Sequence, residues 1–209
     1  MKFIGITGGV GAGKSAILSY LAGKPKTRVL LADEIAHDLM EPGTDCYKEI
    51  VEQFEGLDIF VKANGESESN QPPFDRTKLA QVIFSDACRR EQMNGIVHPA
   101  VKEFVREAYT VEKEKNELEL LVLEAALLIE EEYDEICDEL WYIYTSEENR
   151  RKRLKESRGY SDEKIDNIFN SQLKETEFRA STQVTIDNNG DLEETMKQIE
   201  QALRRKADE

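Results

Sequence analysis

Short apolar runs alternate with longer amphipathic stretches along the 209 residues of this chain. A short apolar run bounded by turn-forming residues predicts a buried strand, whereas apolar residues spaced three and four apart predict a helix. The runs that predict strands are Phe3–Ile6, Val29–Leu31, Leu118–Ala125, Leu140–Tyr144 and Gln183–Ile186. Because these five segments alternate with helical patterns, we predict an α/β fold built on a five-stranded parallel sheet.

Helical patterns occupy most of the chain between the predicted strands. The helices that they predict are Lys14–Leu21, Glu34–Met40, Cys46–Phe54, Leu79–Phe84, Pro99–Lys115, Ser161–Glu175 and Asp191–Arg205, together with a basic helix directly after the fourth strand. The pattern continues through Met93 and Ile96, and we expect it to break at His98–Pro99, because proline is favoured in the first turn of a helix and disfavoured in its interior. Ser161 is a residue type that caps helix N-termini, and we expect it to do so here.

The segment between the second and third predicted strands is unusually long. Residues 42–115 hold mostly helical patterns. Within them, Leu57–Phe74 is polar and irregular, with Asn64-Gly65 and Pro72-Pro73, and it predicts a loop or hairpin on the surface. We therefore predict a helical, substrate-facing subdomain inserted into the α/β core.

The first predicted strand leads into a glycine-rich segment that carries the strongest chemical signal. Gly8–Ser15 fits the pattern G-x-x-x-x-G-K-[ST], in the strand-then-helix context of a phosphate-binding loop (P-loop). Glycines let backbone N–H groups converge on phosphate oxygens, and the new helix adds its unpaired N–H groups. Lys14 supplies a mobile cation for the β- and γ-phosphates, and the Ser15 hydroxyl can ligate Mg²⁺. The residues expected to bind nucleotide here are Gly9, Val10, Gly11, Ala12, Gly13, Lys14 and Ser15.

The loop and the strand order together predict a three-layer P-loop kinase-like fold in a single domain, residues 1–209. We predict a core of residues 1–41, 116–146 and 176–209, the helical insertion 42–115, and a lid over residues 147–175. ATP is the expected co-substrate and Mg²⁺ the expected cofactor.

The charge of the chain narrows its possible partners. The 43 acidic and 28 basic residues give a net charge of −15, which argues against general nucleic-acid binding. Against this background, Arg150–Arg158 carries six cations and one anion in nine residues. Such a segment suits a lid that neutralises phosphate charge, although a solvated helix face is the alternative.

The cysteines and the apolar runs indicate the cellular compartment in which we expect the protein. No apolar run reaches membrane-spanning length, and Met1 leads straight into a strand rather than a secretory signal. Cys46, Cys88 and Cys137 are odd in number and form no C-x-x-C pair, as expected of reduced intracellular thiols. We expect a cytoplasmic protein with no membrane partner, and the sequence indicates no obligate protein partner.

A P-loop alone indicates only that a protein binds a nucleoside triphosphate. The chain contains no N-K-x-D guanine-reading motif and only one P-loop, which disfavours a GTPase and a motor ATPase. Asp33 follows the second strand, at the sheet edge where ligands collect, and could accept a proton from a hydroxyl or hold a metal-bound water. A helix N-cap is the alternative for Asp33. Glu124 ends the third strand, the position of a Walker-B-type acid. These features favour a small-molecule kinase.

Several short motifs in a fixed order resemble those of the dephospho-coenzyme A (dephospho-CoA) kinase family along nearly the whole chain. The matching positions are Gly5–Ser15; Ala32, Asp33, Ile35, Ala36 and His37; Pro42, Gly43 and Tyr47; Asp75, Arg76, Leu79, Ile83 and Phe84; Asn94, Ile96, His98 and Pro99; and Ile186–Gly190. This resemblance implies ATP-dependent phosphorylation of the 3′-hydroxyl of dephospho-CoA, which gives CoA and ADP.

The resemblance also implies roles for particular residues. Asp33 would be the base, and Lys14 and Arg153 would complete the catalytic set. The residues implied to bind substrate are Thr7, Asp33, Arg76, His98, Leu127 and Glu130, and those implied to bind nucleotide besides the P-loop are Arg150, Arg158, Asn188 and Gly190. Another nucleoside or nucleotide kinase, or a catalytically weakened nucleotide-binding homologue, is the alternative.

The chain departs from the family pattern at three places. Leu31 replaces the first acid of the motif around Asp33, and Ala126 replaces a proline after the third strand. In the lid, Ser157 stands where the family has its second arginine, and Arg158 follows one place later. Either Arg158 reaches the phosphates because the helix has already ended, or Arg150 and Arg153 act alone.

Overall fold

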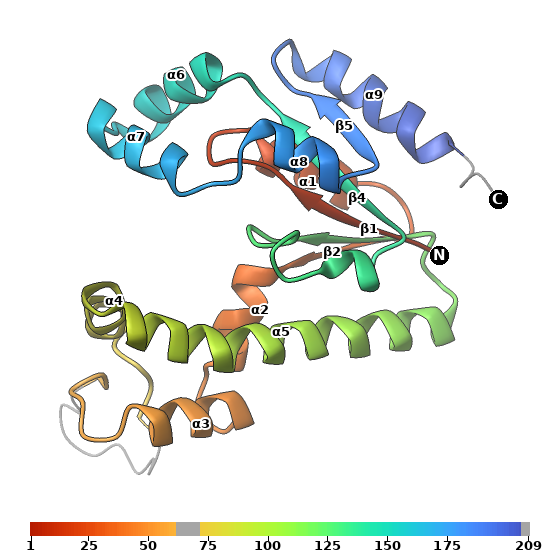
Figure 1. The fold of residues 1–209 in the computed structure, drawn as a ribbon. Helices are drawn as coiled ribbons and strands as arrows, with labels where there is room; N and C mark the ends of the chain where they lie inside the picture. The colour runs from red at the N-terminus through yellow and green to blue at the C-terminus, as the bar shows by residue number, and fades with distance from the viewer. Residues whose placement is uncertain (62–71, 206–209) are drawn as a thin grey trace. The chain divides into compact units, whose positions relative to one another are not determined.

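The strands form one parallel sheet, as predicted. The structure is a computed structural model that describes residues 1–61 and 72–205 (Figure 1). Within these residues the sheet has the order β2-β3-β1-β4-β5, with every neighbouring pair parallel. The strands are β1 (Lys2–Thr7), β2 (Thr27–Leu31), β3 (Leu120–Glu124), β4 (Glu139–Tyr144) and β5 (Val184–Asp187). All five carboxyl ends therefore meet at one edge, where the P-loop begins.

Helices make up much of the rest of the described residues. They are α1 (Lys14–Ala22), α2 (Ala32–Leu39), α3 (Asp45–Gln53), α4 (Arg76–Ser85), α5 (Ala87–Lys115), the short 3₁₀ helix η1 (Tyr133–Glu135), α6 (Glu147–Arg158), α7 (Asp162–Asn170), α8 (Glu175–Ser181) and α9 (Leu192–Arg204). In the described part of the chain, none of them combines the length and the apolarity needed to cross a bilayer.

The two faces of the sheet are buried by different elements. On one face, Ile4, Trp141 and Ile186 pack with Ile17 of α1 and Ile199 of α9 in a fully apolar cluster. On the other face, the ring of Phe3 stacks on Tyr109 of α5 at 5.2 Å, and that of Tyr142 stacks on Phe178 of α8 at 4.7 Å. Burial on both faces explains why the central strands are nearly continuous apolar runs.

The long helix α5 is not interrupted at His98–Pro99, so that prediction was wrong. Pro99 lies inside α5. Its ring would crowd the carbonyl of Gly95 in a regular helix. The buried residues of one face continue on both sides of the proline, at Met93, Val97, Val101 and Val105. Their burial stabilises the helix through the proline.

The single helix predicted for Ser161–Glu175 is two helices. Ser161 caps α7 as expected, since its hydroxyl accepts from the N–H of Lys164 at 3.3 Å. However, α7 ends at Asn170, and α8 begins after Lys174, whose N–H donates to the carboxylate of Glu177 at 2.7 Å. This hydrogen bond caps the N-terminus of α8, so a new helix begins there.

The chain forms two compact units, residues 1–31 with 109–209, and residues 32–108. The first contains the sheet and the segment predicted as a lid. The second contains α2 to α4 and most of α5, with a core in which the ring of Tyr47 packs at a tilt against that of Phe74, with 4.8 Å between the ring centres. Phe60 and Phe74 form an isolated antiparallel bridge, in keeping with the predicted loop or hairpin, whose Asn64-Gly65 portion lies outside the described residues. The predicted division into core, insertion and lid stays a prediction.

The three cysteines are free thiols in different environments. Cys46 and Cys137 are buried, and burial raises the pKa of both, that of Cys137 to about 12, whereas Cys88 is exposed. We predict that iodoacetamide rapidly alkylates only Cys88 in the native protein at mildly alkaline pH, because the thiolate is the reactive form. Intact-mass spectrometry checks this, and Cys88→Ser should abolish the fast phase. Rapid alkylation of that variant would contradict the buried positions.

Candidate functional site

The P-loop turns sharply between β1 and α1. Gly11 and Gly13 have φ values of 84° and 87°, a region that favours glycine. A side chain on Gly13 would also collide with the amide nitrogen of Asn188, which lies directly against the loop. Glycine is therefore required at position 13 for two independent reasons, its backbone conformation and its close neighbour.

Lys14 lies over the loop that it follows. Its Nζ donates to the carbonyl of Gly8 at 2.7 Å and lies 3.4 Å from Oε1 of Glu124 at the end of β3. Both side chains are mostly buried, at 16% and 17% exposed, so the cation and the carboxylate interact more strongly than a surface pair. The arrangement places a mobile cation and an oxygen ligand beside the loop that is expected to hold phosphates.

The donor set around the P-loop fits a nucleotide-borne Mg²⁺ rather than a resident metal. Ser15 is exposed in the first turn of α1, and Glu124 lies beside Lys14, so a hydroxyl and a carboxylate are at hand. Among residues 1–61 and 72–205, no group of three or more His, Cys, Asp or Glu side chains is placed to hold a metal ion. Mg²⁺ often takes only one or two protein oxygens and completes its shell with waters and substrate phosphates, which agrees with this set.

The carbonyl of Ala12 fixes the P-loop to two other loops. It accepts from Nδ2 of Asn188 at 2.7 Å, from the Thr145 hydroxyl at 3.0 Å and from Arg153 at 3.3 Å. Asn188 itself is held from behind, because the hydroxyl of buried Thr195 donates to its Oδ1 at 3.0 Å. The sequence motif around Asn188 thus serves, at least, to hold the loop in place.

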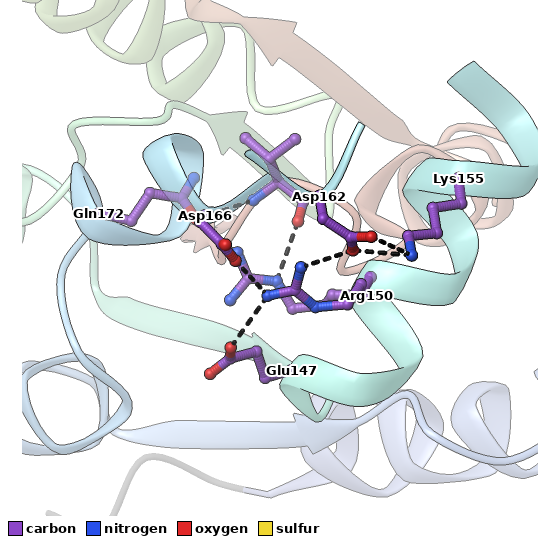
Figure 2. Close-up of polar contacts among 8 residues, drawn as sticks. Glu147, Arg150, Lys155, Asp162, Asp166 and Gln172 are labelled. Carbon is purple, nitrogen blue, oxygen red and sulfur yellow. Dashed lines mark hydrogen bonds and ion pairs between the residues drawn. The ribbon is translucent and has the colours of Figure 1, made fainter. Parts of the chain in front are cut away.

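The segment predicted as a lid, in which Figure 2 labels Arg150 and Gln172, holds the peptide group of Val10 by hydrogen bonds. Nε of Arg150 donates to the Val10 carbonyl at 2.9 Å, and the Val10 N–H donates to Oε1 of Gln172 at 3.3 Å. The same oxygen of Gln172 accepts from Nη2 of Arg150, and the guanidinium lies 4.3 Å from the centre of the Phe169 ring. Burial lowers the pKa of Arg150 from its ordinary value, yet the group stays fully charged at neutral pH.

The arginines of α6 lie at different distances from the loop. Arg153 reaches it, with Nη2 donating to the Asn188 carbonyl at 2.7 Å. Arg158 is the last residue of α6 and lies 5.9 Å from the centre of the Tyr160 ring. The helix has therefore not ended before Arg158, and that premise for its reaching the phosphates was wrong. Of the three arginines, the structure brings Arg150 and Arg153 to the P-loop.

Three predicted residues belong to the unit of residues 32–108. Asp33 is exposed and is the second residue of α2, so it does not occupy the N-cap position. Arg76 lines a cavity of about 270 Å³ with His37 and mainly apolar side chains, whereas His98 is not among the lining residues. This cavity lies wholly within the unit, between α2, α4 and α5.

The remaining predicted residues lie along the edge of the sheet unit. Thr7 is buried at the end of β1, while Leu127 and Glu130 are exposed in the turns after β3, and Gly190 is in the loop before α9. Sequence reasoning missed residues that hold the loop: Thr145, Phe169, Gln172 and Thr195. No motif marks Thr145 and Gln172, because they contact residues 133 and 162 positions away, and Thr195 acts only indirectly, through Asn188.

Comparisons with known proteins show the family to which this chain belongs. The family sequence model described as dephospho-CoA kinase matches residues 2–194. A dephospho-CoA kinase of Oceanobacillus iheyensis is 33% identical over 205 residues, which are 97% of this chain and 96% of the relative. A solved Thermus thermophilus structure has a TM-score of 0.70 at 27% identity, over 97% of this chain and 96% of that one. The solved dephospho-CoA kinase of Campylobacter jejuni shares the fold, with a TM-score of 0.68 at 19% identity over 98% and 96% of the two chains.

We predict that Asn188→Ala lowers the free energy of unfolding by about 1–3 kcal/mol, because a buried amide that bonds the Ala12 carbonyl and Thr195 is lost. Urea denaturation monitored by circular dichroism measures the change. Asn167→Ala, an exposed position on α7, is the matched control and should be nearly neutral. Equal stability of the two variants would show that the Asn188 contacts contribute nothing.

Proposed function

Because this chain belongs to the dephospho-CoA kinase family, we propose that it transfers the γ-phosphate of ATP to the 3′-hydroxyl of dephospho-CoA. The products are CoA and ADP, so the protein is a phosphotransferase with an alcohol acceptor that acts in CoA biosynthesis. The observation that carries the proposal is a complete P-loop, with Lys14 beside Glu124, in a chain that matches the family over residues 2–194.

The P-loop residues bind the triphosphate in this proposal. The backbone N–H groups from Gly9 to Ser15 surround the phosphate oxygens, and Nζ of Lys14 moves from the Gly8 carbonyl to the β- and γ-phosphates. Gly190 and Asn188 lie in the loop before α9, which we assign to the adenine side. Ser15 would hold the Mg²⁺ that accompanies ATP, and such an ion would neutralise phosphate charge.

Asp33 is the proposed base. A carboxylate that accepts the proton of the 3′-hydroxyl orients that oxygen for in-line attack on the γ-phosphorus. Thr7, Arg76 and His98, together with Leu127 and Glu130, are proposed to bind the acceptor. The apolar cavity beside Arg76 supports an acceptor-binding role for residues 32–108, because most of its lining is suited to an uncharged part of a ligand.

Arg150 and Arg153 are the proposed lid cations. Both already touch backbone carbonyls of the P-loop, so their charges lie beside the site of phosphoryl transfer without further reorganisation. We retain Arg158 as a candidate that would have to leave Tyr160 to contribute. The absence of any paired cysteine motif supports a cytoplasmic location.

An assay of ADP production with dephospho-CoA and Mg·ATP tests the proposal. The acceptors to compare are dephospho-CoA, nucleosides and nucleoside monophosphates. Turnover confined to dephospho-CoA is expected, and a new 3′-phosphate is detectable by mass spectrometry of the product. Preference for a nucleoside monophosphate would assign the protein to a different small-molecule kinase activity.

We predict that Asp33→Asn lowers kcat by about 10²–10⁴-fold and leaves ATP affinity unchanged, because the amide cannot accept the hydroxyl proton. Steady-state kinetics and an ATP titration measure the two quantities. Asp38→Asn changes an exposed carboxylate on the same helix and is the matched control. Wild-type turnover by Asp33→Asn would remove Asp33 from the role of base.

We predict that Lys14→Ala weakens triphosphate binding by about 10- to 100-fold and lowers turnover as well, because a charge-assisted contact with the phosphates is lost. Isothermal titration with a non-hydrolysable ATP analogue gives the affinity. Lys26→Ala removes an exposed lysine from the same unit and should bind normally. Undiminished affinity in the Lys14 variant would contradict the assignment of the P-loop.

A further inference from the structure

A second cavity lies in the sheet unit, next to the lid arginine that grips the P-loop. Its volume is about 330 Å³, and it lies between the carboxyl end of β4 and the segment from α6 to α8. Its lining includes Tyr142, Tyr144, Arg150, Phe169, Lys174 and Phe178. None of the sequence motifs falls on this cavity apart from Arg150, and the proposed reaction assigns it no ligand.

The hydroxyl of Tyr142 is a hydrogen-bond donor that the protein leaves available in this cavity. The residue is only 4% exposed, and its ring is stacked on Phe178 with an angle of 4° between the planes. Within residues 1–61 and 72–205, no donor or acceptor is within hydrogen-bonding distance of this hydroxyl. Burial raises the pKa of Tyr142, so the phenol stays protonated and can donate. Because Tyr142 lines the cavity, its hydroxyl can donate to a ligand that enters there.

Two cations in the wall also lack anionic partners. The guanidinium of Arg150 is held by neutral acceptors, the Val10 carbonyl and the Gln172 amide oxygen, and by the Phe169 ring. Neither Arg150 nor Lys174 has a carboxylate within ion-pair distance in the described part of the chain. Arg150 is partly buried and Lys174 is exposed. A partly buried cation without a counter-ion, as Arg150 is, favours binding of an anion, and Lys174 adds a second positive charge to the wall.

Three carboxylates line the same cavity, but each is already paired. Glu147 and Asp166 both contact the guanidinium of Arg151, the former at 3.6 Å (Figure 2). Glu175 pairs with Arg179 at 2.8 Å. Arg151 and Arg179 do not line the cavity, although Arg179 lies 4.7 Å from the centre of the Tyr144 ring in its wall. The lining charges that have no ion-pair partner within the described residues are those of Arg150 and Lys174.

We propose that this cavity binds a phosphate or diphosphate group of a small molecule, separately from the phosphates held by the P-loop. The Tyr142 hydroxyl, the Arg150 guanidinium and the Lys174 ammonium supply the donors, and the aromatic side chains limit access of water. Two sources share this chemistry: the diphosphate of dephospho-CoA, an identification that rests on the proposed function, and a separate phosphorylated ligand.

A pyrophosphate titration tests the site directly. Inorganic pyrophosphate is titrated into the full chain whose P-loop is filled with a non-hydrolysable Mg·ATP analogue. We expect binding in the wild type, and about fivefold weaker binding in Tyr142→Phe and in Lys174→Gln, since each loses one hydrogen bond to the anion. The matched controls are Tyr109→Phe, whose hydroxyl contacts Lys113, and Lys152→Gln, an exposed lysine of α6; both should bind as the wild type does.

The outcomes separate the site from the proposed function. No pyrophosphate binding beside the ATP analogue, or equal affinity in both cavity variants and both controls, overturns the site. With weakened pyrophosphate binding, a KM for dephospho-CoA raised about fivefold at an unchanged KM for ATP identifies the substrate diphosphate. Unchanged KM values for both substrates identify a separate phosphorylated ligand.

A raised KM for ATP alone overturns the site, because the cavity then belongs to the nucleotide. Wild-type protein inactive on dephospho-CoA rejects the proposed function but leaves the pyrophosphate test standing.

Discussion

The Ala12 carbonyl is the point on which the candidate site depends, because three side chains from separate elements converge on it. Asn188 comes from the loop before α9, Thr145 from the end of β4, and Arg153 from α6. A glycine-rich loop has high conformational freedom and would lose much of it on binding phosphate. Contacts that fix its backbone beforehand reduce that loss, so the loop is preorganised for a ligand.

The neighbouring peptide of Val10 adds charge to this preorganisation. Arg150 is held there by the Val10 carbonyl and the neutral amide oxygen of Gln172, and among residues 1–61 and 72–205 no carboxylate forms an ion pair with it. A carboxylate in place of Gln172 would hold the guanidinium as firmly, but would cancel the field that it projects onto the loop. Because the partners of Arg150 are neutral, its charge keeps the electrostatic potential positive beside the P-loop of this strongly acidic protein.

How far the sequence could predict this molecule depends on how local each feature is. The P-loop and the five strands depend on short contiguous patterns, and both were predicted. The break at Pro99 was wrong, because burial of residues on both sides outweighs a local proline signal. Gln172 was missed, because its role comes from a contact with Val10, 162 positions away. The functional roles of Asp33 and His98 remain predictions that depend on the family resemblance.

The basic segment of α6 presents its cations on two faces of the helix. Side chains three or four positions apart share a helix face, and Arg150 and Arg153 lie on the face that meets the P-loop. Arg151 and Lys155 lie on another face, where both pair with Asp162 of α7. Ser157 continues the loop-facing row, but its hydroxyl bonds to the Arg153 carbonyl of its own helix at 2.6 Å. Arg150 and Arg153 thus meet the P-loop, whereas Arg151 and Lys155 hold α6 and α7 together.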